Sequence, residues 1–259
     1  KKHCERHSLY SRKKKSKSPQ VSRQDCFNIL KSIDSKASLR AELVKAREAA
    51  RKRSTDPSAW VDEFDKLILF IDDPAHWPIH PIFTPGNSKL PFHSFSVAPV
   101  VTCPGAGECL SFCYSYKAFR YPAAFGRMVQ NTFLMEHSRL MVSHAFRSLP
   151  AGTLRLYVDG DFKDLNTLKY WLRKLRRRPD IQAYGYSKSL DLFLEYDAAG
   201  YTWPDNYKLN ISSGSRFDGT DVIRQVERLP VSRGRFIAVP VQTAQRTDQK
   251  QYAREVRAA

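Results

Sequence analysis

The sequence has no apolar run that approaches the ~20 residues needed to cross a lipid bilayer. Its first residues, Lys1-Lys2-His3, include neither a methionine nor the apolar stretch that is typical of a secretory signal peptide. We therefore expect a soluble cytoplasmic protein with no membrane partner.

Cysteine is scarce and odd in number. The five cysteines are Cys4, Cys26, Cys103, Cys109 and Cys113. An odd count, with three cysteines crowded into eleven residues, does not suggest a disulfide framework. It favours a reducing compartment in which thiolates serve as ligands.

Acidic residues are too few to balance the basic ones, and the formal net charge is +17. Residues 1–60 hold 17 Lys and Arg against 6 Asp and Glu, so most of the excess is N-terminal. Such an excess favours polyanions through counterion release, and nucleic acid is the expected partner. A solvated basic arm is the alternative. The candidate nucleic-acid contacts are Arg12, Lys13, Lys14, Lys15, Lys17, Arg51, Lys52 and Arg53.

Three regions follow one another along the chain. Residues 1–22 predict a flexible basic tail, and residues 23–91 predict a helical region that ends in a proline-rich linker. Within it, helical patterns cover 23–56 and 58–73, with Ser58 as a possible N-cap of the second. Residues 92–259 alternate between strand and helix patterns.

That alternation predicts a parallel sheet with right-handed crossovers. The expected strands are 93–102, 153–162, 181–189, 207–215 and 235–242. The expected helices are 123–147, 164–178 with Asp164 as N-cap, 191–200 and 221–229. The predicted fold is an α/β partial (β/α) barrel or open sheet with a basic helical N-terminal extension.

A cysteine loop follows the first of these strands, in the segment TCPGAGECLSFCY. Its spacing is C-x5-C-x3-C, and its glycines allow the backbone to fold tightly. Thiolates are soft ligands that suit an iron–sulfur cluster or zinc, so Cys103, Cys109 and Cys113 are the candidate metal ligands. His93 and Cys26 are candidates for a fourth ligand. Three buried structural cysteines are the alternative.

Polar residues stand at the carboxyl ends of the other expected strands, where ligands gather in parallel α/β proteins. Asp159 and Asp161 should share one face of an extended segment and could meet one cation or amine. Helix capping, or a salt bridge to Lys188, is the alternative. Asp161 and Lys188 are the catalytic candidates. The cofactor-binding candidates are Asp159, Gly160, Asp161, Ser187, Asn210 and Ser212.

The segments TCPGAGECLSFCY, LRLYVDGDF, IQAYGYSKS and KLNISSGSRFD resemble a phage- and plasmid-borne family named after a mycobacteriophage gene product, gene product eighty-eight. The order of these pieces is also similar to radical S-adenosylmethionine (SAM) proteins. That resemblance implies a [4Fe–4S] cluster on Cys103, Cys109 and Cys113, and a SAM amine near Asp159, Gly160 and Asp161. The usual radical-SAM spacing, C-x3-C-x2-C, is narrower than the one found here.

Three functions follow from these features. The first is a cluster-dependent, radical-SAM-like enzyme of a mobile genetic element that acts on or with nucleic acid. The second is a non-catalytic DNA- or RNA-binding protein with a structural metal site. The third is a nuclease that uses Asp159 and Asp161 with Mg²⁺.

Overall fold

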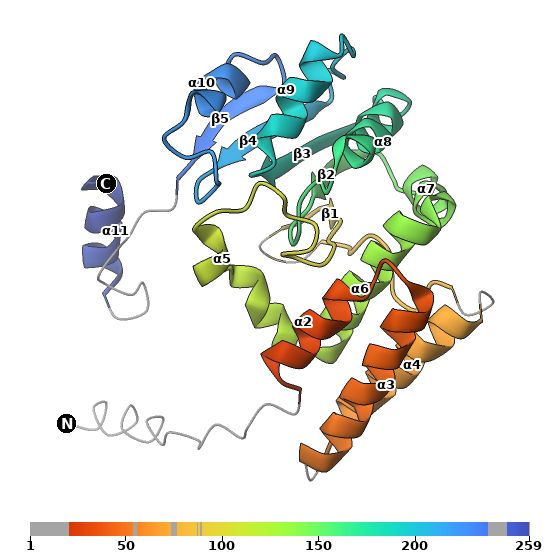
Figure 1. Cartoon of the computed structure of the whole chain (residues 1–259). Coiled ribbons are helices and arrows are strands. Elements are labelled where there is room, and N and C mark those ends of the chain that lie inside the picture. Colours follow the sequence, from red (N-terminus) through yellow and green to blue (C-terminus); the bar gives the residue numbers. More distant parts are fainter. Residues whose placement is uncertain are drawn as a thin grey trace. The chain divides into compact units, whose positions relative to one another are not determined.

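The computed structural model describes residues 21–53, 56–73, 77–86, 88, 90–237 and 248–258 (Figure 1). The chain divides into two compact units. The first comprises residues up to 80 together with 117–126, and the second comprises 81–116 and 127–259. The expected boundary at residue 91 lies inside the second unit, and most of the expected tail, 1–22, lies outside the described residues. In the part described, no helix combines the length and apolarity that a bilayer span requires.

The described residues of the first unit include the helices α2 (Arg23–Lys31), α3 (Lys36–Arg53) and α4 (Ser58–Asp72). The helical region expected over 23–56 is therefore two helices. Ser22 and Asp25 form a capping box that starts α2. Pro57 is the N-cap of α4, so Ser58 is its first helical residue and not its cap.

The second unit is built on a five-stranded parallel sheet. Its strands are β1 (His93–Ser94), β2 (Gly152–Leu156), β3 (Ile181–Ser187), β4 (Tyr207–Ser212) and β5 (Ser232–Phe236), in the spatial order 1-2-3-4-5. Neighbours pair in parallel throughout, which confirms the expected α/β class. Among the described strands β1 and β5 are the edges, so the sheet is open and not a closed barrel. β1 is shorter than expected, and β5 begins before the expected 235–242.

Helices link successive strands. They are α8 (Leu165–Arg176), α9 (Leu190–Ala198) and α10 (Asp221–Glu227), and they lie along one side of the sheet in Figure 1. Right-handed crossovers between neighbouring strands in this order place every connecting helix on the same face. The expected cap of α8 is confirmed, because the Asp164 carboxylate accepts the Thr167 N–H at 2.6 Å.

The connection between β1 and β2 is longer and carries the cysteines. It contains α5 (Cys109–Phe112), a 3-10 helix (Tyr114–Arg120), α6 (Pro122–His137) and α7 (Arg139–Arg147). The single helix expected over 123–147 is thus broken at Ser138. A last helix, α11 (Gln249–Ala258), follows residues that the structure does not describe.

The two faces of the sheet differ in burial, as β3 shows. Ile181, Ala183 and Gly185 are buried, whereas Tyr184 and Tyr186 are half-buried. Side chains alternate between faces along a strand, so one face carries the core and the other is more open. At the core, Trp171 of α8 is fully buried and donates its Nε1–H to Tyr157 Oη at 2.8 Å.

Candidate functional site

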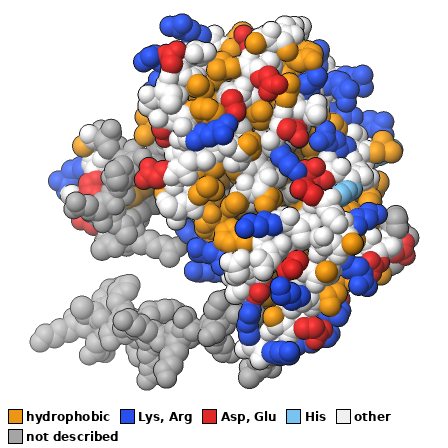
Figure 2. All heavy atoms as spheres, in the orientation of Figure 1, with side chains coloured by type: hydrophobic (Ala, Val, Ile, Leu, Met, Phe, Trp, Pro, Cys, Tyr) orange, Lys and Arg blue, Asp and Glu red, His pale blue; other side chains and the backbone are white. Residues whose placement is uncertain are grey.

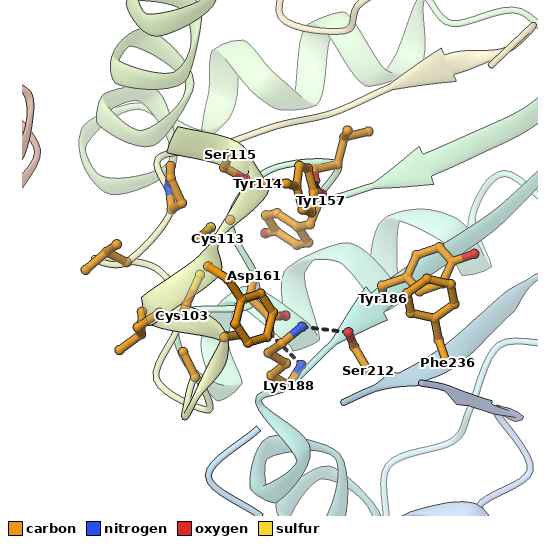
Figure 3. Close-up of a pocket in the computed structure, with 18 of the residues that line it drawn as sticks. Cys103, Cys113, Tyr114, Ser115, Tyr157, Asp161, Tyr186, Lys188, Ser212 and Phe236 are labelled. Atoms are coloured by element: carbon orange, nitrogen blue, oxygen red, sulfur yellow. Dashed lines mark hydrogen bonds between the residues drawn. The ribbon is translucent and has the colours of Figure 1, made fainter. Parts of the chain in front are cut away.

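A cavity of about 430 Å³ lies between the cysteine loop and the carboxyl ends of the strands (Figure 3). All three loop cysteines line it, together with residues at the carboxyl ends of β2, β3 and β4. Among these are Gly160, Asp161, Lys188 and Ser212. The structure therefore brings the cysteine loop and several of the expected strand-end residues to one place.

The cysteine loop is fastened to the loops that follow β3 and β4. Gly105 approaches Lys188 so closely that a Cβ at position 105 would lie 1.9 Å from the Lys188 carbonyl oxygen. The Gly105 carbonyl accepts the Arg216 N–H and the Ser215 hydroxyl, each at 3.0 Å. The same Ser215 hydroxyl lies 3.0 Å from the Lys188 carbonyl. These contacts explain why the motif contains glycine at this position.

Burial disfavours the thiolate forms of Cys103 and Cys109. Burial raises the pKa of Cys103 to about 12, and the nearby Asp161 charge adds to that rise. Burial also raises the pKa of Cys109, while the positive charge of Lys188 opposes the rise. A metal or cluster that binds these sulfurs as thiolates must displace their protons.

Asp161 supports the loop that follows β3. One carboxylate oxygen accepts the Phe162 N–H and the Ser187 hydroxyl, both at 2.8 Å. The other accepts the N–H groups of Lys188 and Ser189 at 2.8 and 3.2 Å, and the Ser189 hydroxyl at 3.2 Å. Burial raises the pKa of this carboxyl, and the hydrogen bonds oppose the rise. With five donors from the chain, Asp161 holds the site together and has little capacity left for a substrate.

Asp159 does not share a face with Asp161, contrary to the expectation. β2 ends at Leu156, and the backbone then turns through positive φ at Tyr157 (56°) and Gly160 (78°). The segment is therefore not extended. Asp159 is not among the residues that line the cavity. Burial raises the pKa of its carboxyl group, and hydrogen bonds from Ser115 and Ser96 oppose that rise.

Lys188 presents its ammonium group to the cavity and donates to Ser212 Oγ at 2.6 Å (Figure 3). Its hydrogen bond to Asp161 is made by the backbone N–H, so the alternative of a Lys188 salt bridge to Asp161 is not observed among the described residues. Of the other cofactor candidates, Ser187 is fully buried beneath Asp161, and Asn210 donates to the Gly185 carbonyl at 3.1 Å. Neither lines the cavity.

Sequence reasoning missed the cation and the aromatic rings at the open side of the cavity. Arg155 of β2 lies over the Tyr186 ring, 4.9 Å from its centroid, and its Nε has no hydrogen-bond partner among the described residues. Tyr186 packs edge-on against Phe236 of β5 at 5.1 Å. The signal available in the sequence was the alternation along β3, which places Tyr186 on the more open face.

The two candidates for a fourth ligand occupy different parts of the chain. His93 lines a separate pocket with Gly152 and Ile181, the first residues of β2 and β3, so it lies at the opposite edge of the sheet. Cys26 is fully buried within α2 of the other unit, where burial raises its pKa to about 12.

The donor set around the cavity consists of soft sulfurs. Among the described residues, no group of three or more His, Cys, Asp or Glu is arranged to hold one metal ion. One tetrahedral zinc with bonds of about 2.3 Å would need its sulfurs roughly 3.8 Å apart. In a [4Fe–4S] cluster each thiolate binds a different iron, so its sulfurs stand farther apart than those around one zinc ion. A nuclease site on Asp159 and Asp161 gains no support, because Asp161 accepts five donors from the chain and Asp159 does not line the cavity.

The expected nucleic-acid residues are only partly described. Arg12, Lys13, Lys14, Lys15 and Lys17 lie outside the described residues. At the end of α3, Arg51 pairs with Glu48 at 2.7 Å, and Arg53 pairs with Asp25. Lys52 is exposed. Ion pairs therefore neutralise part of this basic helix end.

Comparison with known proteins gives one match. Residues 75–259, which include the whole sheet and the cysteine loop, match the family model described as Gene product 88. No curated protein and no solved structure matches the chain. Because the matched region covers more than half of the sequence, the chain belongs to the Gene product 88 family.

Proposed function

We propose that this chain binds a [4Fe–4S] cluster through Cys103, Cys109 and Cys113 and is a radical-SAM-like enzyme of a mobile genetic element that acts on or with nucleic acid. The observation that carries the proposal is the convergence of all three loop cysteines on one cavity at the carboxyl edge of a parallel sheet.

The chemistry of the cavity supports a cluster over a single metal ion. Its donors are three thiols, and Asp161, the carboxylate that lines the cavity, already accepts hydrogen bonds from the chain. Three thiolates leave one iron of a [4Fe–4S] cluster open to a small molecule. When bound, such a cluster supplies one-electron chemistry at that iron.

In this proposal, different residues around the cavity have different roles. Lys188 places a positive charge beside Cys109, which favours the thiolate form of that ligand. Asp161 fixes the backbone that presents Lys188. Arg155 and Tyr186 offer a cation and an aromatic face to the non-reacting part of a substrate.

The SAM part of the proposal rests on backbone and cavity groups, since the Asp161 carboxylate is committed to the β3 loop. A SAM amine would have to meet the turn around Gly160, which lines the cavity. Cluster binding and SAM cleavage are therefore tested separately.

The first test uses the full chain purified without air. We expect a broad visible absorbance, with iron and sulfide near four each per chain. Changing Cys103, Cys109 or Cys113 to Ser should remove both signals. The matched control is Cys26→Ala, which should keep them because the Cys26 side chain is fully buried. Zinc instead of iron would support the structural-metal alternative, and no bound metal would contradict the proposal.

The second test adds SAM and a reductant to the cluster-loaded protein. Release of 5′-deoxyadenosine, lost in the Cys103→Ser variant, is expected. A loaded cluster without SAM cleavage would refute the radical-SAM part.

A further inference from the structure

A second cavity, of about 710 Å³, lies on the helical layer among α7, α8 and α9. Five of its lining residues are basic and none is acidic. The basic residues are Arg139, Lys169, Arg173, Lys174 and Arg176. Lys and Arg side chains also gather at the upper right of Figure 2, where Figure 1 draws α8.

The hydrogen bonds of these cations go to neutral acceptors. Lys169 donates to Tyr201 Oη at 2.6 Å, and Arg176 donates to Tyr196 Oη and the Thr202 carbonyl at 3.2 and 3.0 Å. Arg139 Nε donates to the Met135 carbonyl at 2.7 Å. Their positive charge is therefore oriented by the fold without being neutralised at the cavity.

The spacing along α8 concentrates this charge. Lys169, Arg173 and Arg176 stand at i, i+4 and i+7, so they form one stripe on the helix. Like charges at such spacing destabilise an isolated helix. Burial together with the charges of Arg173, Arg177 and Arg147 lowers the pKa of Lys174, which shows how closely the cations are packed.

The helix dipole does not explain the cluster. A dipole favours cations within the last turn of a helix, which accounts for Arg173, Lys174 and Arg176. Lys169 stands one turn earlier, and Arg139 belongs to the first turn of α7, where the dipole disfavours a cation. A ligand that carries several negative charges accounts for all five.

Tyrosines lie between these cations. Lys169 lies 4.3 Å from the centroid of the Tyr201 ring, and Lys174 lies 5.4 Å from that of Tyr170. Basic residues interleaved with aromatic rings are typical of nucleic-acid surfaces, whereas a lipid surface would meet bulky apolar anchors. Leu140 is the exposed aliphatic side chain of this cavity.

We infer that the cavity among α7, α8 and α9 is a docking site for the phosphodiester backbone of a nucleic acid. The inference deepens the nucleic-acid part of the proposed function and moves it from the N-terminal arm to the α/β unit. It does not depend on the cluster.

The test measures binding of the full chain to labelled single-stranded DNA, double-stranded DNA and RNA of equal length over a range of salt concentrations. The variant is Arg173→Gln/Lys174→Gln, because no described residue forms a hydrogen bond with either side chain. We expect affinity to fall at least about tenfold at 100 mM salt. The slope of log K against log salt should become shallower by about 1.4–1.8, as for two lost phosphate contacts.

The matched control is Lys45→Gln/Lys66→Gln on α3 and α4, which removes the same charge from exposed positions that are not among the candidate nucleic-acid contacts. It should bind nearly as the parent does. Equal losses in the two double variants would overturn the inference, since binding would then follow total charge. Parent-like binding by Arg173→Gln/Lys174→Gln would also overturn it.

Two further measurements distinguish this inference from the cluster proposal and from membrane binding. The Cys103→Ser variant should lose cluster absorbance and keep oligonucleotide binding, so the two proposals fail independently. Vesicles of phosphatidylserine and phosphatidylcholine should bind the parent weakly. Tight vesicle binding without oligonucleotide binding would assign the cavity to a membrane surface and refute the inference.

Discussion

Asp161 shows how one side chain can decide the shape of a site without reacting in it. Its carboxylate gathers donors from Phe162, from Ser187 and from the backbone of Lys188 and Ser189. Buried polar groups are costly unless they are paired, and this group has a donor for each of its main acceptor positions. The loop that carries Lys188 therefore depends on a residue 27 positions earlier in the sequence.

The first prediction concerns Asp161→Asn. The amide keeps the size of the side chain, but its NH2 group cannot accept from Lys188 and Ser189, so buried donors lose their acceptor. We expect the free energy of unfolding to fall by about 2–4 kcal/mol, measured by urea denaturation. Asp180→Asn, at an exposed pair with Arg178, should change stability little. Similar stabilities for the two variants would contradict this account of Asp161.

At the scale of elements, the cysteine loop is positioned by packing more than by its own conformation. It passes over the ends of β3 and β4, and Ala106 pairs with Ser215 in an isolated bridge. The N–H groups of Gly107 and Cys109 both donate to the Gly214 carbonyl, at 3.0 and 3.1 Å. The positions of the thiols therefore depend on the loop that follows β4.

The second prediction concerns Gly105→Ala. Its Cβ would meet the Lys188 backbone, so the loop must lift, and we expect a loss of roughly 2–3 kcal/mol in stability. Iron content after anaerobic purification should fall as well. The matched control is Gly200→Ala, where φ is +72° and the added Cβ meets nothing within 4 Å. That variant should lose stability through backbone strain alone and keep its iron.

At the scale of the whole molecule, positive charge occurs in more than one place. Residues 1–20 hold eight Lys and Arg against one Glu, and the cavity among α7, α8 and α9 holds five cations. Each region can release counterions from a polyanion, and the contributions to the salt dependence add when the contacts are separate.

The third prediction is a double-mutant cycle on these two regions. A chain that begins at Val21 and the Arg173→Gln/Lys174→Gln variant should each weaken oligonucleotide binding. Their effects should add within about 0.5 kcal/mol of binding free energy. Circular dichroism should confirm that the shortened chain folds. If Arg173→Gln/Lys174→Gln has no effect in the shortened chain, the two regions act as one site and the prediction is wrong.

Much of the fold was readable from the sequence because it rests on local patterns. Alternating strand and helix patterns predicted the parallel α/β class, and Asp164 was correctly placed as the cap of α8. The grouping of Cys103, Cys109 and Cys113 on one loop after the first strand was also a local feature. Strand and helix ends were less accurate, as the break at Ser138 and the short β1 show.

What the tertiary structure alone decided is which side chains are still available for a ligand. In the sequence, Asp159, Asp161 and Lys188 look equally available to a ligand. In the structure, the Asp161 carboxylate accepts hydrogen bonds from the chain and Asp159 does not line the cavity. Lys188 lines the cavity and donates to Ser212 there. The cations of α7 and α8 are 30 or more positions apart in the chain, and helix packing brings them to one cavity. Periodicity follows from each segment's own residues, whereas the partners of a polar group depend on segments distant in sequence, and only the folded chain brings those together.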